Sequence, residues 1–424
     1  MKRYETYKDS GIQWVGEIPS HWEIVKLRYT GTFENGLTYS TGDIVEDDGI
    51  LVLRSSNIQN EHITFDDCVY VNSVPKELMV SKGDIIICSR NGSAALIGKC
   101  AIIEDDVKAS FGAFMMRYRA NINYKFAFYL FLSAVANYRG LFSTSTINQL
   151  TMSIINQMQV ALPSDTEQKN IAAFLDHKVG QIDATIAEKE QMLEDIKAYR
   201  SAIISEAVTK GLDKNVEMKD SGIEWCGYIP IHWQVLKIGY IFQNLDYLRQ
   251  PISSENRERN NPQYEYYGAS GVIDKIDSYN VNDKVLLIGE DGANLVSRTL
   301  PLIYKAEGKF WVNNHAHILK PISSDYDYMA FLLETADYTN YITGSAQPKL
   351  SQEKLSSVKL PVPPIEEQKQ IAKKLICIVP LIDRSLIEIE KIIKDLKSYK
   401  SALITEAVTG KIDLRDWKPK KENV

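Results

Sequence analysis

Apolar residues recur at alternating spacings of three and four along two long stretches, 165–209 and 365–409. A 3.5-residue repeat that continues for about five heptads is typical of a coiled coil. Each stretch predicts a helix, and about 40 helical residues at 1.5 Å rise span roughly 60 Å. Lys189 and Arg200 interrupt the first seam, and Lys400 takes the place of Arg200 in the second. The seam positions are Leu175, Val179, Ile182, Ile186, Leu193, Ile196, Ile203, Leu375, Val379, Ile382, Leu386, Ile389, Ile393, Leu396 and Leu403.

Both helices have recognisable starts. Asp165 together with Gln168 is interpreted as the cap of the first helix. Pro363 and Pro364 lead into the second helix, where proline at the first positions is well tolerated. Pro380 lies deeper inside the second pattern, and we expect it to kink or interrupt that helix near its first third.

The stretches before the helices predict strands and one shorter helix in each half. KGDIIICSRNG (82–92) stands opposite NDKVLLIGEDG (282–292), and each reads as a strand that ends in a polar glycine turn. CAIIEDD and PLIYKAEG follow as second strands, and FGAFMMRYRA (111–120) and FWVNNHAHIL (310–319) as third strands. Residues 124–138 and 326–341 have helical spacing. Each half therefore predicts a mixed α/β globule of about 150 residues.

The motif near the start of the chain occurs a second time in its middle. KDSGIQWVGEIPSHW (8–22) and KDSGIEWCGYIPIHW (219–233) agree at eleven of fifteen positions, at an offset of 211. The helical stretches match at an offset of 200: VALPSDTEQKNIA with LPVPPIEEQKQIA, and IKAYRSAIISEAVTKGLD with LKSYKSALITEAVTGKID. The chain is therefore an internal repeat of about 200 residues. The four tryptophans of the openings are interpreted as anchors that join each globule to the helices; they are Trp14, Trp22, Trp225 and Trp233.

Two similar helices, each following its own globule, bury both seams most simply against each other. Antiparallel pairing would hold two α/β domains apart on a two-helix coiled coil with pseudo-twofold symmetry. The alternative is that each helix packs on its own globule, but a five-heptad seam is too long for one such globule to cover. The predicted domains are 1–162, a first α/β domain; 163–213, the first coiled-coil helix; 214–362, a second α/β domain; 363–413, the second coiled-coil helix; and 414–424, a tail.

Composition and charge describe an ordinary globular protein. Of 424 residues, 44% are hydrophobic and 25% charged, with a net charge of −6. Residues 1–162 carry 15 basic and 17 acidic side chains, and residues 214–362 carry 15 and 18. A DNA-binding role would therefore need local positive charge and help from partners. The five cysteines are scattered and predict buried, reduced thiols. We expect no membrane span and no secretion signal, and hence a cytoplasmic protein.

Signals of catalysis are weak. The sequence has no Asn/Asp-Pro-Pro-Tyr/Phe motif for amino methylation, and GSAALIGKC (92–100) has the wrong glycine spacing for a phosphate loop. His315 and His317 alternate on a predicted strand and face one side, but too few further ligands accompany them for a metal site. Glu290 and Asp291 align with Arg90 and Asn91, so no carboxylate chemistry is repeated, and a solvated or DNA-facing loop is favoured.

The chain resembles the specificity subunit of type I restriction–modification systems from Lys8 to Asp413. The duplicated openings, PPIEEQKQIA and the two S-A-I/L-I-x-E-A-V-T helix ends carry the resemblance, with YYGASGVIDKI, LLIGEDGANL, GKFWVNNHAHILKP and QPKLSQEKL in the second half. SDTEQ departs from the usual Pro-Pro lead-in and implies an altered helix start.

The resemblance implies a non-catalytic subunit with two target recognition domains. Each domain reads one half of a split double-stranded DNA site, and the helices act as a spacer and as the dock for two methyltransferase subunits. Motor–nuclease (restriction) subunits then join this core. No cofactor is expected in this chain; S-adenosylmethionine, ATP and Mg²⁺ are expected in the partner subunits.

Side chains that read base edges are expected on polar loops at strand ends. The first-domain candidates are Arg54, Ser55, Ser56, Asn57, Arg90, Asn91, Ser93, Lys99, Thr144, Ser145 and Thr146. The second-domain candidates are Ser270, Asn294, Arg298, Asn313, Asn314, His315, Gln347 and Lys349. Because the two interiors differ in sequence, the DNA site should be asymmetric.

Three other functions fit parts of the sequence. A stand-alone sequence-specific regulator that dimerises through its coiled coil would need its own basic face. An enzyme with a duplicated catalytic domain would repeat one acid, base or nucleophile in both halves. A carbohydrate- or peptide-binding module on a stalk fits poorly with free cysteines and no signal sequence.

The length of the coiled coil should set the gap between the two DNA words. Inserting one heptad in one helix should lengthen that gap, because a heptad adds about 10 Å at 1.5 Å rise per residue. The measurement is the spacing of the methylated site in host DNA. An unchanged gap would show that the helices do not set the distance.

Overall fold

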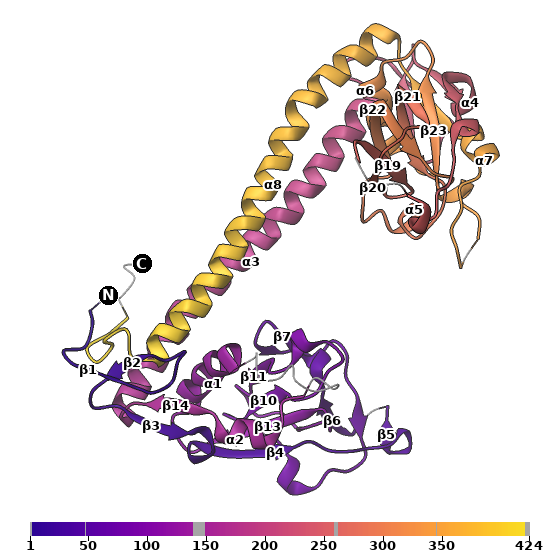
Figure 1. The fold of residues 1–424 in the computed structure, drawn as a ribbon. Helices are drawn as coiled ribbons and strands as arrows, with labels where there is room; N and C mark the ends of the chain where they lie inside the picture. Colours follow the sequence, from indigo (N-terminus) through magenta and orange to yellow (C-terminus); the bar gives the residue numbers. More distant parts are fainter. Residues whose placement is uncertain (1, 47, 139–148, 258–261, 345, 420–424) are drawn as a thin grey trace. The chain divides into compact units, whose positions relative to one another are not determined.

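The chain forms two compact units. The computed structural model describes residues 2–46, 48–138, 149–257, 262–344 and 346–419. One unit comprises Met1–Glu190 with Lys391–Val424, and the other comprises Gln191–Glu390. Each unit contains one α/β domain and a part of both long helices, α3 (Asp165–Lys210) and α8 (Ile365–Val408) (Figure 1). The predicted long helices are thereby confirmed.

The α/β domain of the first unit has two four-stranded sheets. The first has the order β11 (Cys100–Ile102), β10 (Ile85–Cys88), β13 (Met115–Ala120) and β4 (Gly31–Asn35), and all its pairs are antiparallel. The second has the order β12 (Ala109–Phe111), β6 (Ile50–Leu53), β9 (Tyr70–Val71) and β5 (Ile44–Val45). A small hairpin joins β7 (Ile58–Gln59) to β8 (His62–Ile63). The helices of the domain are α1 (Tyr124–Tyr138) and α2 (Met152–Gln157).

The α/β domain of the second unit has one six-stranded sheet. Its order is β18 (Phe242–Asn244), β23 (Ala316–Pro321), β21 (Val281–Gly289), β22 (Ile303–Val312), β19 (Tyr264–Gly268) and β20 (Gly271–Ile276). The helices are α4 (Ile238–Ile241), α5 (Asn294–Ser297), α6 (Tyr326–Thr335) and α7 (Gln352–Ser357). The apolar strand β21 lies between β22 and β23, as a strand buried on both faces should.

The framework around the sheets is the same in both units. The openings form the hairpins β1 (Tyr7–Asp9)–β2 (Glu17–Pro19) and β15 (Met218–Asp220)–β16 (Tyr228–Pro230). The next strand pairs with the strand that precedes the long helix: β3 (Glu23–Lys26) with β14 (Gln159–Leu162), and β17 (Gln234–Lys237) with β24 (Lys359–Val362). The predicted boundaries at 162/163 and 362/363 follow directly after these strands.

A Trp–His pair anchors each opening to the start of a long helix. Trp22 donates its indole N–H to Glu167 at 3.2 Å, and Nε2 of His21 lies 2.9 Å from the same carboxylate. In the second unit Trp233 and His232 make the corresponding bonds to Glu367, at 3.1 and 2.8 Å. Trp22 and Trp233 are fully buried. The interpretation of these tryptophans as structural anchors is confirmed.

The cap of α3 lies one residue earlier than predicted. Ser164, not Asp165, caps the helix: its hydroxyl accepts from the backbone N–H of Glu167 at 3.4 Å and donates to the Glu167 carboxylate at 2.8 Å. Gln168 instead reaches out of the helix, donating to the carbonyl of Pro163 and accepting from the N–H of Asn123. SDTEQ therefore starts the helix with a capping box where the second half uses Pro363-Pro364.

The two helices run antiparallel within each unit. In the first unit, Asp183 pairs with Lys400 at 2.8 Å and Glu190 pairs with Lys397 at 2.9 Å, so residue numbers rise on α3 as they fall on α8. In the second unit, Arg200 of α3 pairs with Asp383 of α8 at 2.6 Å. Every predicted seam residue is buried or half-buried. The apolar seam and its antiparallel pairing are confirmed.

Pro380 was expected to kink or interrupt the second helix; the interruption is wrong, because α8 continues through Pro380 to Val408. Proline removes one backbone N–H and so frees the carbonyl four residues earlier, at Ile376. Both Pro380 and Ile376 lie on the exposed side of α8, where water can satisfy that carbonyl. The helix therefore tolerates the proline.

Both long helices end on glycine and pack there on an opening segment. Gly211 and Gly410 have φ values of +76° and +73°, in the left-handed region that favours glycine. A Cβ at Gly410 would lie 2.4 Å from Pro19, and one at Gly211 would lie 2.9 Å from Glu367. The end of α8 thus meets the first opening, as the end of α3 meets the second.

Some predicted element limits differ from the structure. The strand expected at 310–319 is divided, because Phe310–Val312 continues β22 and a turn separates it from β23. The helix expected at 326–341 ends at Thr335, where the Arg298 guanidinium binds the carbonyls of Glu334 and Ala336. Of the cysteines, Cys377 is exposed and Cys68 half-buried, so only Cys88, Cys100 and Cys226 are buried as expected.

Replacing Trp22 by Phe should lower the free energy of unfolding of the first unit by about 2–4 kcal/mol. The change removes the hydrogen bond to a buried carboxylate and leaves a cavity. Trp233→Phe should have a similar effect on the second unit, and Tyr240→Phe, at an exposed ring, should have none. Urea denaturation measures all three. Equal stability of Trp22→Phe and the unchanged protein would contradict an anchoring role.

Candidate nucleic-acid interface

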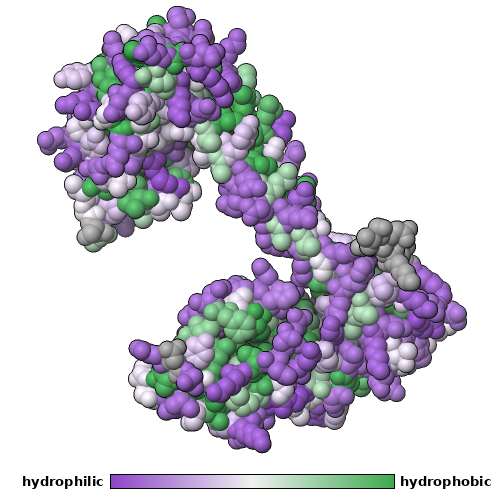
Figure 2. Space-filling view, turned by 180° about the vertical axis from the view of Figure 1, so that it is seen from behind, coloured by the Kyte–Doolittle hydropathy of each residue, from purple (hydrophilic) through white to green (hydrophobic). Residues whose placement is uncertain are grey.

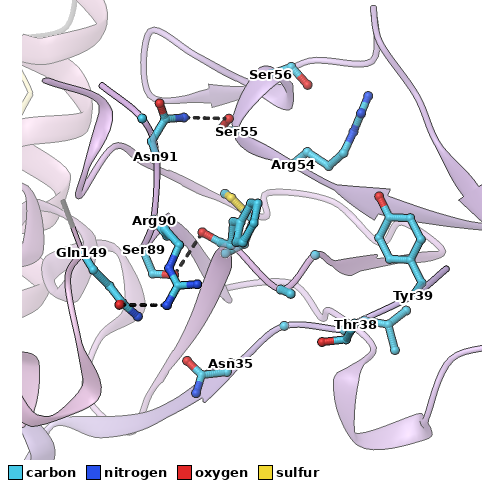
Figure 3. Close-up of a pocket in the computed structure, with 17 residues that line it drawn as sticks. Asn35, Thr38, Tyr39, Arg54, Ser55, Ser56, Ser89, Arg90, Asn91 and Gln149 are labelled. Atoms are coloured by element: carbon cyan, nitrogen blue, oxygen red, sulfur yellow. Dashed lines mark hydrogen bonds between the residues drawn. The ribbon is translucent and has the colours of Figure 1, made fainter. Parts of the chain in front are cut away.

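A groove lined by both polar and apolar side chains lies at one edge of the first domain. Its volume is about 1270 Å³, and its walls come from loops at strand ends: after β4, after β6, after β10 and before β13 (Figure 3). Because β10 and β13 are antiparallel, the end of one and the start of the other meet at the same sheet edge. The predicted candidates Arg54, Ser55, Ser56, Arg90 and Asn91 all line this groove.

Arg90 is the most available cation of the groove. Its guanidinium donates to Oε1 of Gln149 at 2.9 Å and stands 5.7 Å from the ring centre of Phe114. Among the residues that the structure describes, no carboxylate pairs with it. Arg54 differs, because Asp67 holds its guanidinium at 2.7 Å. Arg90 therefore keeps donors and charge for a ligand.

Other predicted side chains support the groove. The amide of Asn91 donates to the Ser55 hydroxyl at 3.3 Å, and Lys99 donates to the Ser55 carbonyl at 3.2 Å. Asn91 also accepts from the backbone N–H of Ser93, an exposed residue at the rim. These bonds tie the loop after β10 to the loop after β6. Thr144, Ser145 and Thr146 lie outside the described residues.

Asn57 does not belong to the reading surface. It is fully buried; its Oδ1 accepts from the N–H of Arg54, and its amide donates to the carbonyls of Thr64 and Asp67. A side chain with both ends engaged inside the domain does not reach a base edge. Its role is to shape the loop that carries Arg54, Ser55 and Ser56.

The groove also contains residues that the sequence reasoning did not single out: Asn35, Thr38, Tyr39, Phe114 and Gln149. Gln149 could have been found, because the match of STINQLT with SAQPKLS places it opposite Lys349, which was chosen. Asn35 precedes Gly36, where a Cβ would lie 2.1 Å from the carbonyl oxygen of Gly112. Only glycine permits this close approach of the two loops.

The corresponding edge of the second domain carries an ionic cluster. Glu290 follows β21 and pairs with Arg249 and, at 3.1 Å, with Lys349. Nδ1 of His315 lies 2.8 Å from a carboxylate oxygen of Asp291, within hydrogen-bond distance. Burial would raise the pKa of Glu290, but hydrogen bonds from Arg249 and Lys349 outweigh it and hold that pKa below its usual value. The Glu290 carboxylate of the EDG turn is thus ionised at neutral pH.

The predicted second-domain residues fall into two groups. Ser270, Asn314, His315, Gln347 and Lys349 are exposed near this cluster or in the turns beside it. The others are used within the domain. Asn313 is 5% exposed and accepts from the N–H of His315, Asn294 binds the backbone at Leu300 and Pro301, and Arg298 binds the end of α6. This second group therefore supports the loops, and of its members only Asn313 is buried.

His317 lies in the core and does not share the exposed position of His315. It is fully buried, with Nδ1 2.6 Å from the Asp246 carboxylate and Nε2 2.7 Å from the carbonyl of Leu350. Asp246 also accepts from the N–H of Ile318 at 2.8 Å. Burial would raise the pKa of Asp246, but the bonds from His317 and Ile318 outweigh it and lower that pKa. This pair fixes β23 beneath the exposed cluster.

Neither a membrane span nor a metal cluster appears in the part of the chain that the structure describes. None of the helices in that part combines the length and the apolar character needed to cross a membrane. Among the same residues, no three or more His, Cys, Asp or Glu side chains are arranged to hold a metal ion.

Comparison with known proteins identifies the family. The family model "Type I restriction modification DNA specificity domain" matches twice, at residues 19–197 and 230–395. The chain therefore belongs to the type I restriction–modification DNA specificity family, and its expected resemblance to specificity subunits is confirmed. Subunits of this family are non-catalytic.

The chain is also similar to specificity subunits over nearly their whole length. The chain is 24% identical to the StySPI specificity subunit of Salmonella potsdam, over 94% of this chain and 90% of the relative. It is 27% identical to the putative MjaX specificity subunit of Methanocaldococcus jannaschii, over 95% and 96%. A solved chain described under "complex assembly and conformational transition of the type I R-M system" has the same fold, with a TM-score of 0.70, 14% identity and coverage of 93% and 99%.

Asp246→Asn should destabilise the second unit by about 3 kcal/mol at pH 7, because it breaks a buried pair. The lowered pKa of Asp246 means that this contribution is complete above about pH 4, the usual aspartate pKa. It should be lost as the pH falls further, so the two proteins should converge in strong acid. Urea denaturation at several pH values measures this. Glu353→Gln, at an exposed carboxylate, is the control, and a pH-independent difference would contradict the assignment.

Proposed function

We propose that the chain recognises an asymmetric, bipartite double-stranded DNA site as the specificity subunit of a type I restriction–modification complex. Each α/β domain reads one word of the site through loops at one sheet edge. The observation that carries this proposal is that one duplicated framework supports two different reading edges. Family membership supports the DNA-specificity role over a stand-alone regulator that dimerises through its coiled coil.

We infer that two methyltransferase subunits dock on the helical segments and that restriction subunits join the resulting core. Support comes from apolar side chains exposed on α8 of the second unit, where Ile376, Leu381 and Ile387 are 45, 60 and 66% exposed. Figure 2 shows such apolar (green) atoms along the helical segments. Exposed apolar residues in this number favour a protein partner.

The chemistry of modification and cleavage is proposed to reside in those partners. S-adenosylmethionine would bind the methyltransferase subunits, and ATP and Mg²⁺ the restriction subunits. DNA affinity would also be shared, because each α/β domain carries slightly more acidic than basic groups. We propose that the complex acts in the cytoplasm.

Methylome sequencing tests the proposal. A host that lacks DNA methylation receives this chain together with the methyltransferase encoded beside it. The expected result is N6-methyladenine at a split, asymmetric site, and none when this chain is omitted. Methylation at a continuous site, or none although both proteins are soluble, would contradict the proposal. The purified chain alone should bind DNA weakly, and tight specific binding by it would favour the stand-alone regulator.

A further inference from the structure

Arg90 and Asp291 occupy equivalent places in the two domains. In the first, β10 pairs with β13 as far as Cys88–Met115; in the second, β21 pairs with β23 as far as Gly289–Ala316. Two residues beyond these pairs stand Arg90 and Asp291. Sequence alignment had matched Arg90 with Glu290, so the structure shifts the match by one residue.

The chain segment that passes each position supports the equivalence. An isolated bridge joins Arg90 to Gln149, and another joins Asp291 to Lys349. One residue away, the N–H of Leu150 donates to the carbonyl of Ser89 at 2.8 Å, and the N–H of Leu350 donates to that of Glu290 at 2.8 Å. The same backbone frame therefore presents a cation in one domain and an anion in the other.

We propose that these two side chains read bases of opposite hydrogen-bonding character, an inference that rests on the proposed DNA-reading function. The first word contains a guanine that Arg90 contacts. Asp291 contacts a cytosine or an adenine in the second word, through the exocyclic amino group of that base.

The surroundings of Arg90 suit guanine. Gln149 takes one N–H of the guanidinium (Figure 3). The guanidinium also lies over the ring of Phe114, which leaves a pair of N–H groups for the groove. Guanine offers two acceptors, O6 and N7, side by side in the major groove, and arginine binds both at once. Arg54 is a weaker candidate for this contact because Asp67 neutralises it.

The surroundings of Asp291 suit an amino group. Its side chain is 19% exposed and holds His315 through one oxygen, which leaves acceptor capacity on the carboxylate. Cytosine N4 and adenine N6 donate in the major groove, whereas guanine O6 and N7 and thymine O4 would repel the carboxylate. Glu290 is less suited, because Arg249 and Lys349 already bind it.

The test is methylome sequencing of hosts that carry the methyltransferase with the unchanged chain, Arg90→Gln or Asp291→Asn. The unchanged chain should show a guanine in the first word and a cytosine or adenine in the second. Arg90→Gln should lower the preference for guanine at that position about tenfold to a hundredfold, measured as adenine methylation of sites with guanine there relative to sites with another base, and leave the second word intact. Asp291→Asn should relax one position of the second word only.

Matched controls lie at the opposite ends of strands of the same domains. Arg28 lies just before the start of β4, and the groove residue Asn35 lies at the other end of that strand. Asp277 lies just after the end of β20, and Ser270 lies just before its start. Arg28→Gln and Asp277→Asn should leave both words unchanged. If Arg90→Gln fails to fold, Arg90→Lys replaces it; loss of the paired donors should again reduce guanine preference at that one position.

The outcomes separate the inference from the proposed function. No methylation by the unchanged chain would reject the function. A split site whose altered position is not guanine, or uniform weakening across all sequences by Arg90→Gln or Arg90→Lys, would overturn the inference and leave the function standing. Relaxation of the first word by Asp291→Asn, or no change in either word, would overturn the assignment of Asp291.

Discussion

A carboxylate at the start of each long helix determines how the rest of the unit is assembled. Glu167 is 5% exposed, and a buried carboxylate is stable only when donors surround it. Trp22, His21 and Ser164 supply those donors, and together they outweigh burial and lower the pKa of Glu167. One side chain thereby joins an opening hairpin to a helix start. Glu367 makes the same connection with Trp233 and His232 in the second unit.

Arg200 and Lys400 occupy matching positions in the apolar seams of the two helices, and their ion pairs differ. Arg200 pairs with Asp383, whereas Lys400 pairs with Asp183 and also with Glu61 at 2.6 Å. Burial would lower the pKa of Lys400, but the two carboxylates outweigh it and raise that pKa. Charges inside an apolar seam favour one register, because a shifted register would leave each of them unpaired. In the first unit the pairing also holds the β7–β8 turn against the helices.

Much of this framework could be predicted from the sequence, because it depends on local periodicity and on repetition. The 3.5-residue spacing identified the seam residues, and the duplicated Trp–His phrases identified the anchors. Predictions that depended on packing between distant segments fared differently. Pro380 was expected to kink or interrupt the second helix, and the helix continues through it; Ser164 was overlooked as a cap.

The predicted DNA-contacting residues also divide into those that a local pattern identifies and those whose position depends on packing. Arg90 and Asn91 were found because a polar turn that follows an apolar strand is visible in the sequence. Asn57, Asn313 and Asn294 are polar loop residues of the same kind, yet hydrogen bonds to backbone groups of their own or neighbouring loops make them internal supports. Tyr39 and Phe114 were missed because nothing in the chain indicates that their loops meet at Gly36 and Gly112. Which polar side chain faces outward is decided by tertiary contacts.

The separation of framework from reading edge explains how one fold can carry opposite charges at the same place. The frame around Arg90 and Asp291 consists of backbone hydrogen bonds, which do not depend on the side chains presented. In the second domain the local cations Arg249 and Lys349 neutralise Glu290, so the extra negative charge is compensated within a few ångströms. Discrimination then needs no rearrangement of the sheet. An arginine attracts two acceptors, and an aspartate at the same position rejects them, so a single exchange changes both what is bound and what is excluded.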